Sequence, residues 1–163
     1  MHASILAASY ISGADLKVSV HYRRDLVSLI AREYGKLLSS GLDIILCDDD
    51  PYSGYDEMRE DYLKHHRLKI YTGGTSSPLL SDQLNIMFRA VHDAHHLHID
   101  ADFTLEGEIK AFQYVASLTH SHTLKKLLFS EIVLQAATFY TTGEFPEQRI
   151  VDSPLMSHIL TRG

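Results

Sequence analysis

Residues 89–98 read Arg-Ala-Val-His-Asp-Ala-His-His-Leu-His. Four histidines and one aspartate fall within seven positions of a segment whose apolar residues recur at helical spacing. Residues four apart on a helix lie on one face with Cβ atoms about 6 Å apart, so His92 and His96 can bind the same ion. Zinc-binding helices use this spacing of two histidines. The stretch therefore predicts a helix that carries a metal site.

Asp93 and His95 are rival donors within the same turn. His95 continues an apolar stripe, which favours a second interpretation, a core histidine hydrogen-bonded to a backbone carbonyl. The other members of that stripe are Leu84, Met87, Phe88 and Val91. The spacing alone leaves open whether His95 or His96 faces the ion.

Three consecutive core helices are predicted around this stretch, near residues 78–98, 104–120 and 123–142. Ser77-Pro78 is typical of an N-cap followed by a first helical position, and Thr104 is typical of a second N-cap. Gly143, followed by a proline at position 146, ends the third pattern. We therefore expect a mainly α domain, with an α+β fold as the alternative.

The first half of the chain mixes helical and extended patterns. Apolar residues at helical spacing from Asp25 end at Gly41, and a charged helix is expected over 55–66. Short strands are expected near 16–22, 42–47 and 68–71. Ser153 can begin a last short helix. We expect residues 1–163 to form a single domain with one to three short strands toward the N-terminus.

Two carboxylates fall on apolar faces of the predicted helices. Glu108 aligns with Phe112 and Val115, and Glu131 aligns with Leu127 and other apolar residues of its helix. A carboxylate on a buried face is costly unless it is paired or bound to a cation. A metal ion and a purely structural polar network both account for this pattern, and the metal ion is the interpretation we favour.

Two histidines with one or two carboxylates suit Zn²⁺ or Fe²⁺, which the donor types do not separate. With an open coordination position, such a site can activate water or polarise a carbonyl of a small-molecule substrate, as a hydrolase or lyase does. Glu131 is then the candidate catalytic base or a further ligand. Gln135 and His95 are candidates for supporting hydrogen bonds. A closed site would instead be structural.

His92-Asp93-x-x-His96, followed by eleven residues and Glu108, fits the pattern HDxxH-x11-E. The chain thereby resembles the coenzyme Q biosynthesis family whose members bind zinc and are tied to a decarboxylation that modifies a ring. The resemblance implies His92, Asp93, His96 and Glu108 as the metal-site residues.

Residues 84–140 also resemble a group of phage and mobile-element proteins. The shared pattern is matched by Asn85-Ile-Met-Phe-Arg-Ala-Val-His-Asp93, Phe103, Gly107-Glu108, Ala111, and Glu131 with Gln135. If that resemblance holds, the protein is encoded by a phage and works in the cytoplasm of a bacterial host.

Two alternative functions remain open. A metal-dependent phosphohydrolase resembling the HD superfamily would use His65 or His66, the His92-Asp93 pair, and a distant Asp152. A non-catalytic phage interaction protein would have a buried polar network and an acidic surface that masks a basic host protein.

The bulk composition restricts the class of protein. The chain of 163 residues carries a formal net charge of −6, which makes nucleic acid an unfavourable partner. Cys47 is the single cysteine, so a disulfide-stapled secreted fold is excluded. The start lacks the basic residues of a secretory signal, and no apolar run has the roughly 20 residues of a membrane span. We therefore expect a cytoplasmic protein.

Overall fold

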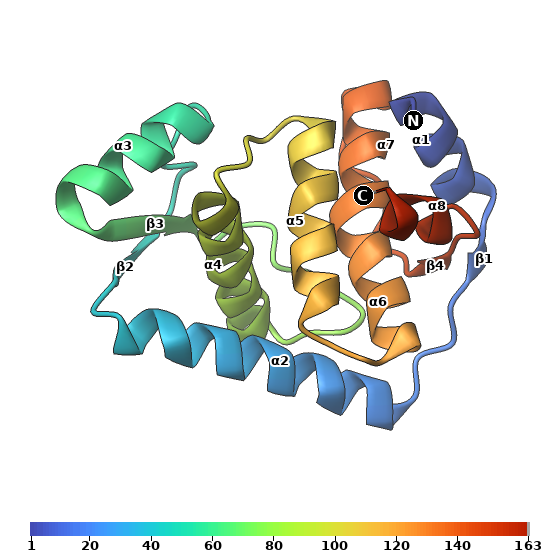
Figure 1. Cartoon of the computed structure of the whole chain (residues 1–163), viewed down its shortest axis with the longest axis horizontal. Helices are drawn as coiled ribbons and strands as arrows, with labels where there is room; N and C mark the ends of the chain where they lie inside the picture. Colours follow the sequence, from blue (N-terminus) through green and yellow to red (C-terminus); the bar gives the residue numbers. More distant parts are fainter. Residues whose placement is uncertain (163) are drawn as a thin grey trace. The chain divides into compact units, whose positions relative to one another are not determined.

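The computed structural model describes residues 1–162, and the fold is mainly α-helical with short strands, as the sequence predicted (Figure 1). The chain divides into two compact units. One consists of Met1–Tyr22 together with Thr104–Gly163, and the other of Arg23–Phe103. The single domain expected over residues 1–163 stays a prediction, which one cooperative unfolding transition would support.

The first unit is built from both ends of the chain. Its helices are α1 (Ala3–Ser12), α5 (Leu105–Ser117), α6 (His122–Leu128), η1 (Phe129–Leu134), α7 (Gln135–Thr142) and α8 (Met156–Thr161). Helix α1 packs against α7 and η1, and α5 packs against α6, η1 and α7. The rings of Phe112 and Phe129 meet at 5.1 Å between centroids in this core. A short antiparallel pair, β1 (Ala14–Asp15) with β4 (Val151–Asp152), joins the two chain segments.

Residues 122–142 form one helical stretch whose middle turn, η1, is π-helical. The helix predicted over 123–142 is confirmed, although the Ser121 side chain caps it by accepting from the Leu124 N–H. Gly143 ends it with a positive φ of 78°, a conformation that favours glycine. A π-helical turn has one extra residue and often marks a functional position.

The second unit contains a β-α-β arrangement between two longer helices. Its elements are α2 (Val20–Ser39, which begins in the first unit), β2 (Asp43–Cys47), α3 (Tyr55–His65), β3 (Arg67–Tyr71) and α4 (Asp82–Ile99). Strands β2 and β3 are parallel, and Leu68 and Ile70 of β3 are buried while Lys69 between them is not. Helix α4 packs against β3, so this sheet supports the helix that carries the histidines.

Some predicted boundaries are wrong. The strand expected near 16–22 is replaced by the start of α2 at Val20. Helix α4 begins at Asp82 instead of Pro78, because Ser81 caps it by accepting from the Leu84 N–H, whereas Ser77 caps only a local turn. Helix α5 has the predicted Thr104 cap but ends at Ser117, before residue 120. Among the described helices, none has the length and apolar character needed to cross a membrane.

Candidate metal centre

Two histidine side chains of α4 converge on one point. The Nε2 atoms of His92 and His96 lie 3.1 Å apart, and the two rings are nearly perpendicular, with centroids 4.6 Å apart. Two nitrogens bound to one tetrahedral zinc at about 2.0–2.1 Å would lie about 3.3 Å apart. The pair therefore has the geometry needed to bind one metal ion, and its spacing of four residues on the helix produces that geometry.

The second nitrogen of His96 indicates its tautomer. Nδ1 lies 2.9 Å from the carbonyl oxygen of Ala101. Because a carbonyl oxygen only accepts, Nδ1 must carry the hydrogen, and in a neutral imidazole Nε2 is then the nitrogen that offers a lone pair. His96 is fully buried, so this hydrogen bond also fixes the ring orientation. A bond of this kind from the non-ligating nitrogen is typical of metal-binding histidines.

The turn that carries the Ala101 carbonyl is held from outside α4. Asp100 caps the helix in a left-handed conformation (φ 50°), and its N–H donates to the carbonyls of His96 and Leu97. The Tyr55 hydroxyl of α3 donates to Oδ1 of Asp100 at 2.8 Å. Burial first, and then this hydrogen bond, raise the pKa of Tyr55 to about 12, so it remains a donor at neutral pH. Tyr55 thus stabilises the turn that orients His96.

Aromatic rings enclose the histidine pair within the second unit. The Phe88 ring stacks with that of His92 at 6.3 Å, and the Phe103 ring meets that of His96 edge-on at 5.0 Å. Tyr55 contacts Phe103 in the same way. These apolar neighbours lower the local polarity, which strengthens electrostatic interactions at the histidine nitrogens.

His95 points to a different partner. Its Nε2 lies 3.2 Å from Oε1 of Glu33 on α2, and both side chains are buried. Burial lowers the pKa of His95 to about 4, although the Glu33 hydrogen bond opposes this, so the ring is neutral and donates from Nε2. His96, rather than His95, lies beside the His92 nitrogen. The interpretation of His95 as a hydrogen-bonded core histidine fits this placement, with a carboxylate in place of a carbonyl.

Asp93 and Glu108 are the other two predicted ligands. Asp93 follows His92 directly, and adjacent helix positions do not share a face. Its charge acts on Arg89, whose pKa is lowered first by burial while Asp93 opposes that shift. Glu108 lies in the first turn of α5, in the other unit. Membership of either residue in the ligand set stays a prediction.

Glu131 and Gln135 lie together in the first unit. Nε2 of Gln135 donates to Oε2 of Glu131 at 3.2 Å, one helical turn away, as the predicted supporting role requires. Burial raises the pKa of Glu131 to about 7, and the Gln135 hydrogen bond opposes the rise. Such a carboxyl can exchange a proton near neutral pH. A catalytic role for Glu131 stays a prediction.

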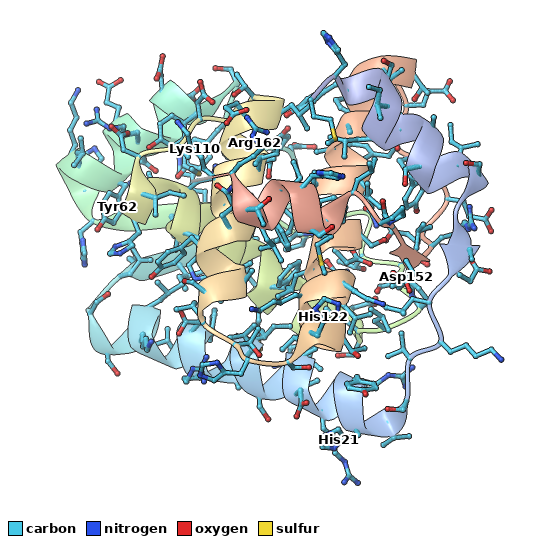
Figure 2. All side chains as sticks on the ribbon, turned by 45° about the vertical axis from the view of Figure 1, so that its right-hand side comes forward. His21, Tyr62, Lys110, His122, Asp152 and Arg162 are labelled. Carbon is cyan, nitrogen blue, oxygen red and sulfur yellow. The ribbon has the colours of Figure 1, made fainter. Side chains whose placement is uncertain are left out.

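The residues of the HD-type alternative have structural partners. His66 caps α3 in a left-handed conformation, and its Nε2 lies 3.1 Å from the carbonyl oxygen of Ser40. Asp152, labelled in Figure 2, lies in β4 and pairs with Lys126 at 2.9 Å. Each side chain therefore has a stabilising role of its own.

Sequence reasoning missed Glu33, Tyr55 and Asp100. Glu33 could have been found, because it lies seven positions after Leu26 and three after Ile30 on the apolar face of α2, the same argument that identified Glu108. Tyr55 and Asp100 gave no comparable pattern, because their contact joins residues 45 positions apart.

No family model matches this chain, and no match to it is found among curated proteins or solved structures. The interpretation of the site therefore depends on its own chemistry.

Proposed function

We propose that this protein binds one divalent metal ion, Zn²⁺ or Fe²⁺, through His92 and His96, with Glu108 as the third ligand. His, His and Glu each offer one ligand atom of the type these ions accept. The observation that carries the proposal is the pair of Nε2 atoms 3.1 Å apart, one of them held in the metal-binding tautomer by Ala101.

Glu108 is preferred as the third ligand for two reasons. Helix α4 ends at Ile99 and α5 begins at Leu105, so a connection of only a few residues joins the histidines to the first turn that carries Glu108. The spacing also fits the HDxxH-x11-E pattern discussed above. In that resemblance Asp93 belongs to the site as well, and we assign it a supporting role beside the ligands.

The chemistry follows from this donor set. Three protein ligands leave an open coordination position, at which zinc or ferrous iron can act as a Lewis acid toward a water molecule or a carbonyl oxygen. His96 would be held in place by Ala101 and the Asp100 turn, while Phe88 and Phe103 would lower the local polarity. We therefore propose a metal-dependent hydrolase or lyase that acts on a small molecule with a carbonyl group.

The test is metal analysis of the purified protein. About one zinc or iron per chain is expected, and His92→Ala and Glu108→Gln should each reduce that content by more than tenfold. His98→Ala on the same helix and Glu106→Gln in the same turn of α5 are matched controls, because both residues are exposed. Their metal content should equal that of the wild type.

Two results would contradict the proposal. A wild-type protein that holds no metal after exposure to zinc and to ferrous iron would remove the site altogether. Full metal content in Glu108→Gln, with loss in His92→Ala, would keep the histidine pair but exclude Glu108 as a ligand.

A further inference from the structure

Glu131 has a buried carboxylate oxygen with no hydrogen-bond partner. That oxygen is Oε1, while Oε2 accepts from Gln135. Glu131 also lies in the π-helical turn η1, and turns of this kind often position functional side chains. An ionised carboxylate with a buried, unsatisfied oxygen is costly, and the cost falls when the group holds a proton or that oxygen meets water.

An irregular segment of residues 144–150, which we call the strap, is bound to the same helical stretch. Gln148 of the strap and Gln135 exchange hydrogen bonds through their amides at 3.3 and 3.5 Å. Ser130, next to Glu131, donates to the Arg149 carbonyl at 3.4 Å and accepts from the Val151 N–H at 3.0 Å. Gln135 therefore binds the carboxyl with one set of contacts and the strap with another.

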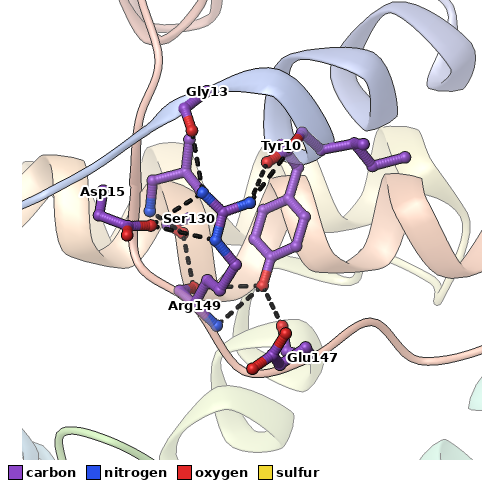
Figure 3. A network of polar contacts seen from close by, with 8 residues as sticks. Tyr10, Gly13, Asp15, Ser130, Glu147 and Arg149 are labelled. Atoms are coloured by element: carbon purple, nitrogen blue, oxygen red, sulfur yellow. Dashed lines mark hydrogen bonds and ion pairs between the residues drawn. The ribbon is translucent and has the colours of Figure 1, made fainter.

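The other side of the strap is anchored to α1, as Figure 3 shows. The Tyr10 hydroxyl donates to the Glu147 carbonyl at 2.6 Å and accepts from the Arg149 N–H at 3.0 Å. The Arg149 guanidinium donates to the Gly13 carbonyl at 2.9 Å and pairs with Asp15 at 2.8 Å. The strap is thus held at two places, one of them beside Glu131.

The charged groups that act on Tyr10 come from the strap and from η1. The pKa of Tyr10 of α1 is raised, mainly by burial. The charges of Glu131, Arg149 and Glu147 also act on it. Arg149 and Glu147 belong to the strap. For Glu131 itself, burial raises the pKa and the Gln135 hydrogen bond opposes the rise.

We propose that Glu131 is a proton-controlled latch for the strap: the neutral carboxyl keeps the strap closed, and the ionised carboxyl releases it. The ionised group draws water to Oε1, and that water competes with the Gln135–Gln148 contact. The strap then leaves the Ser130 side of η1 while Arg149 still anchors it near α1. This inference concerns the first unit alone and does not depend on the metal site.

The test is amide hydrogen exchange in the strap as a function of pH, corrected for the intrinsic rate. The reporter is the N–H group of Val151, which Ser130 binds in the closed strap, while the Arg149 N–H, bound by Tyr10 of α1, should keep its protection. With the pKa of Glu131 at about 7 when closed and 4.5 when open, protection falls about tenfold per pH unit between these values and is constant above them. Glu131→Gln, which stays neutral, should show no such fall.

Glu147→Gln is the matched control, because it removes an exposed carboxylate from the strap itself. It should keep the wild-type pH profile. Carboxyl carbon NMR of the wild type provides a second readout that needs no variant: the Glu131 resonance should titrate near pH 7, where the Val151 protection stops falling. The latch is overturned if Glu131→Gln keeps the pH-dependent fall, or if the Glu131 carboxyl titrates while protection of Val151 stays constant.

Discussion

Two glutamates of this chain, each with a buried carboxylate oxygen, show how partners determine the protonation state of a carboxyl. Glu33 is 5% exposed, and its oxygens meet the Lys36 ammonium at 2.8 Å and the His95 ring at 3.2 Å. Burial alone would raise its pKa, but the Lys36 and His95 hydrogen bonds lower it below the ordinary value. Glu131 has only the Gln135 amide for one oxygen, and burial raises its pKa to about 7.

The difference in pKa between Glu33 and Glu131 separates a structural role from a role in proton exchange. Glu33 is ionised across the neutral range and joins α2 to α4, the helix that carries the histidine pair. Glu131 is half protonated near neutral pH and lies where the helix is π-helical. Burial of an acidic group therefore does not by itself indicate function; the number and charge of its donors distinguish the two cases.

The largest expected effect is a difference in pH dependence. Folding raises the pKa of Glu131. The contribution of its neutral carboxyl to the unfolding free energy is therefore fully present below pH 4.5 and is lost as the pH rises to about 7. Wild-type protein should lose up to about 3 kcal/mol of unfolding free energy over this range relative to Glu131→Gln. Glu33→Gln should change the pH dependence of the unfolding free energy only at acidic pH, where protonation of the wild-type carboxyl removes its stabilising bonds.

Urea unfolding at closely spaced pH values measures both slopes. The comparison would fail if the wild type and Glu131→Gln had parallel stability curves from pH 5 to 7.

A smaller effect is expected from deleting the paired carboxyl. Glu33→Ala leaves the buried N–H of His95 without its acceptor, and should reduce the unfolding free energy by about 2 kcal/mol. Glu60→Ala is the control, because Glu60 forms an exposed pair with Lys64 and should cost less than about 0.5 kcal/mol. Equal losses in the two variants, measured by urea unfolding, would mean that burial of Glu33 is energetically irrelevant.

The smallest effect should come from the turn behind His96. Tyr55→Phe removes the hydrogen bond to Asp100 and should lower stability by about 1 kcal/mol. Since the turn orients His96, zinc affinity should fall by about tenfold as well. Competition with a metal chelator measures the affinity, and Tyr62→Phe on the same helix is the control. Unchanged zinc binding in Tyr55→Phe would show that Ala101 orients His96 without help from α3.

The sequence predicted the mainly α fold, the cap at Thr104 and the end of the third helix at Gly143, because these depend on local chemistry and apolar periodicity. It predicted Ser77 instead of Ser81 as the cap of the histidine helix, because both serines precede helix-compatible residues and Ser77 is followed by a proline. The π-helical turn at Glu131 was also missed, since one extra residue within a long helix leaves the apolar pattern nearly unchanged.

For the candidate site, spacing alone identified His92 and His96 as a pair. The sequence left the choice between His95 and His96 open, because both lie within a turn of His92. The hydrogen-bond partners distinguish the two rings. His95 is hydrogen-bonded to Glu33, whereas Nδ1 of His96 donates to the Ala101 carbonyl. These partners come from a distant helix and from a turn in left-handed conformation, and neither is encoded in the local pattern.

The construction of the first unit from both chain ends also has a consequence for synthesis. Helix α1 leaves the ribosome 123 residues before the start of its partner α7, counting from Ser12 to Gln135. At about 5–20 residues per second, that delay is roughly 6–25 s. Leu6, Ala7 and Tyr10, which are buried in the folded protein, stay uncovered for this time on a helix without a single charged residue. The nascent chain therefore presents an apolar segment to chaperones until α7 has been synthesised.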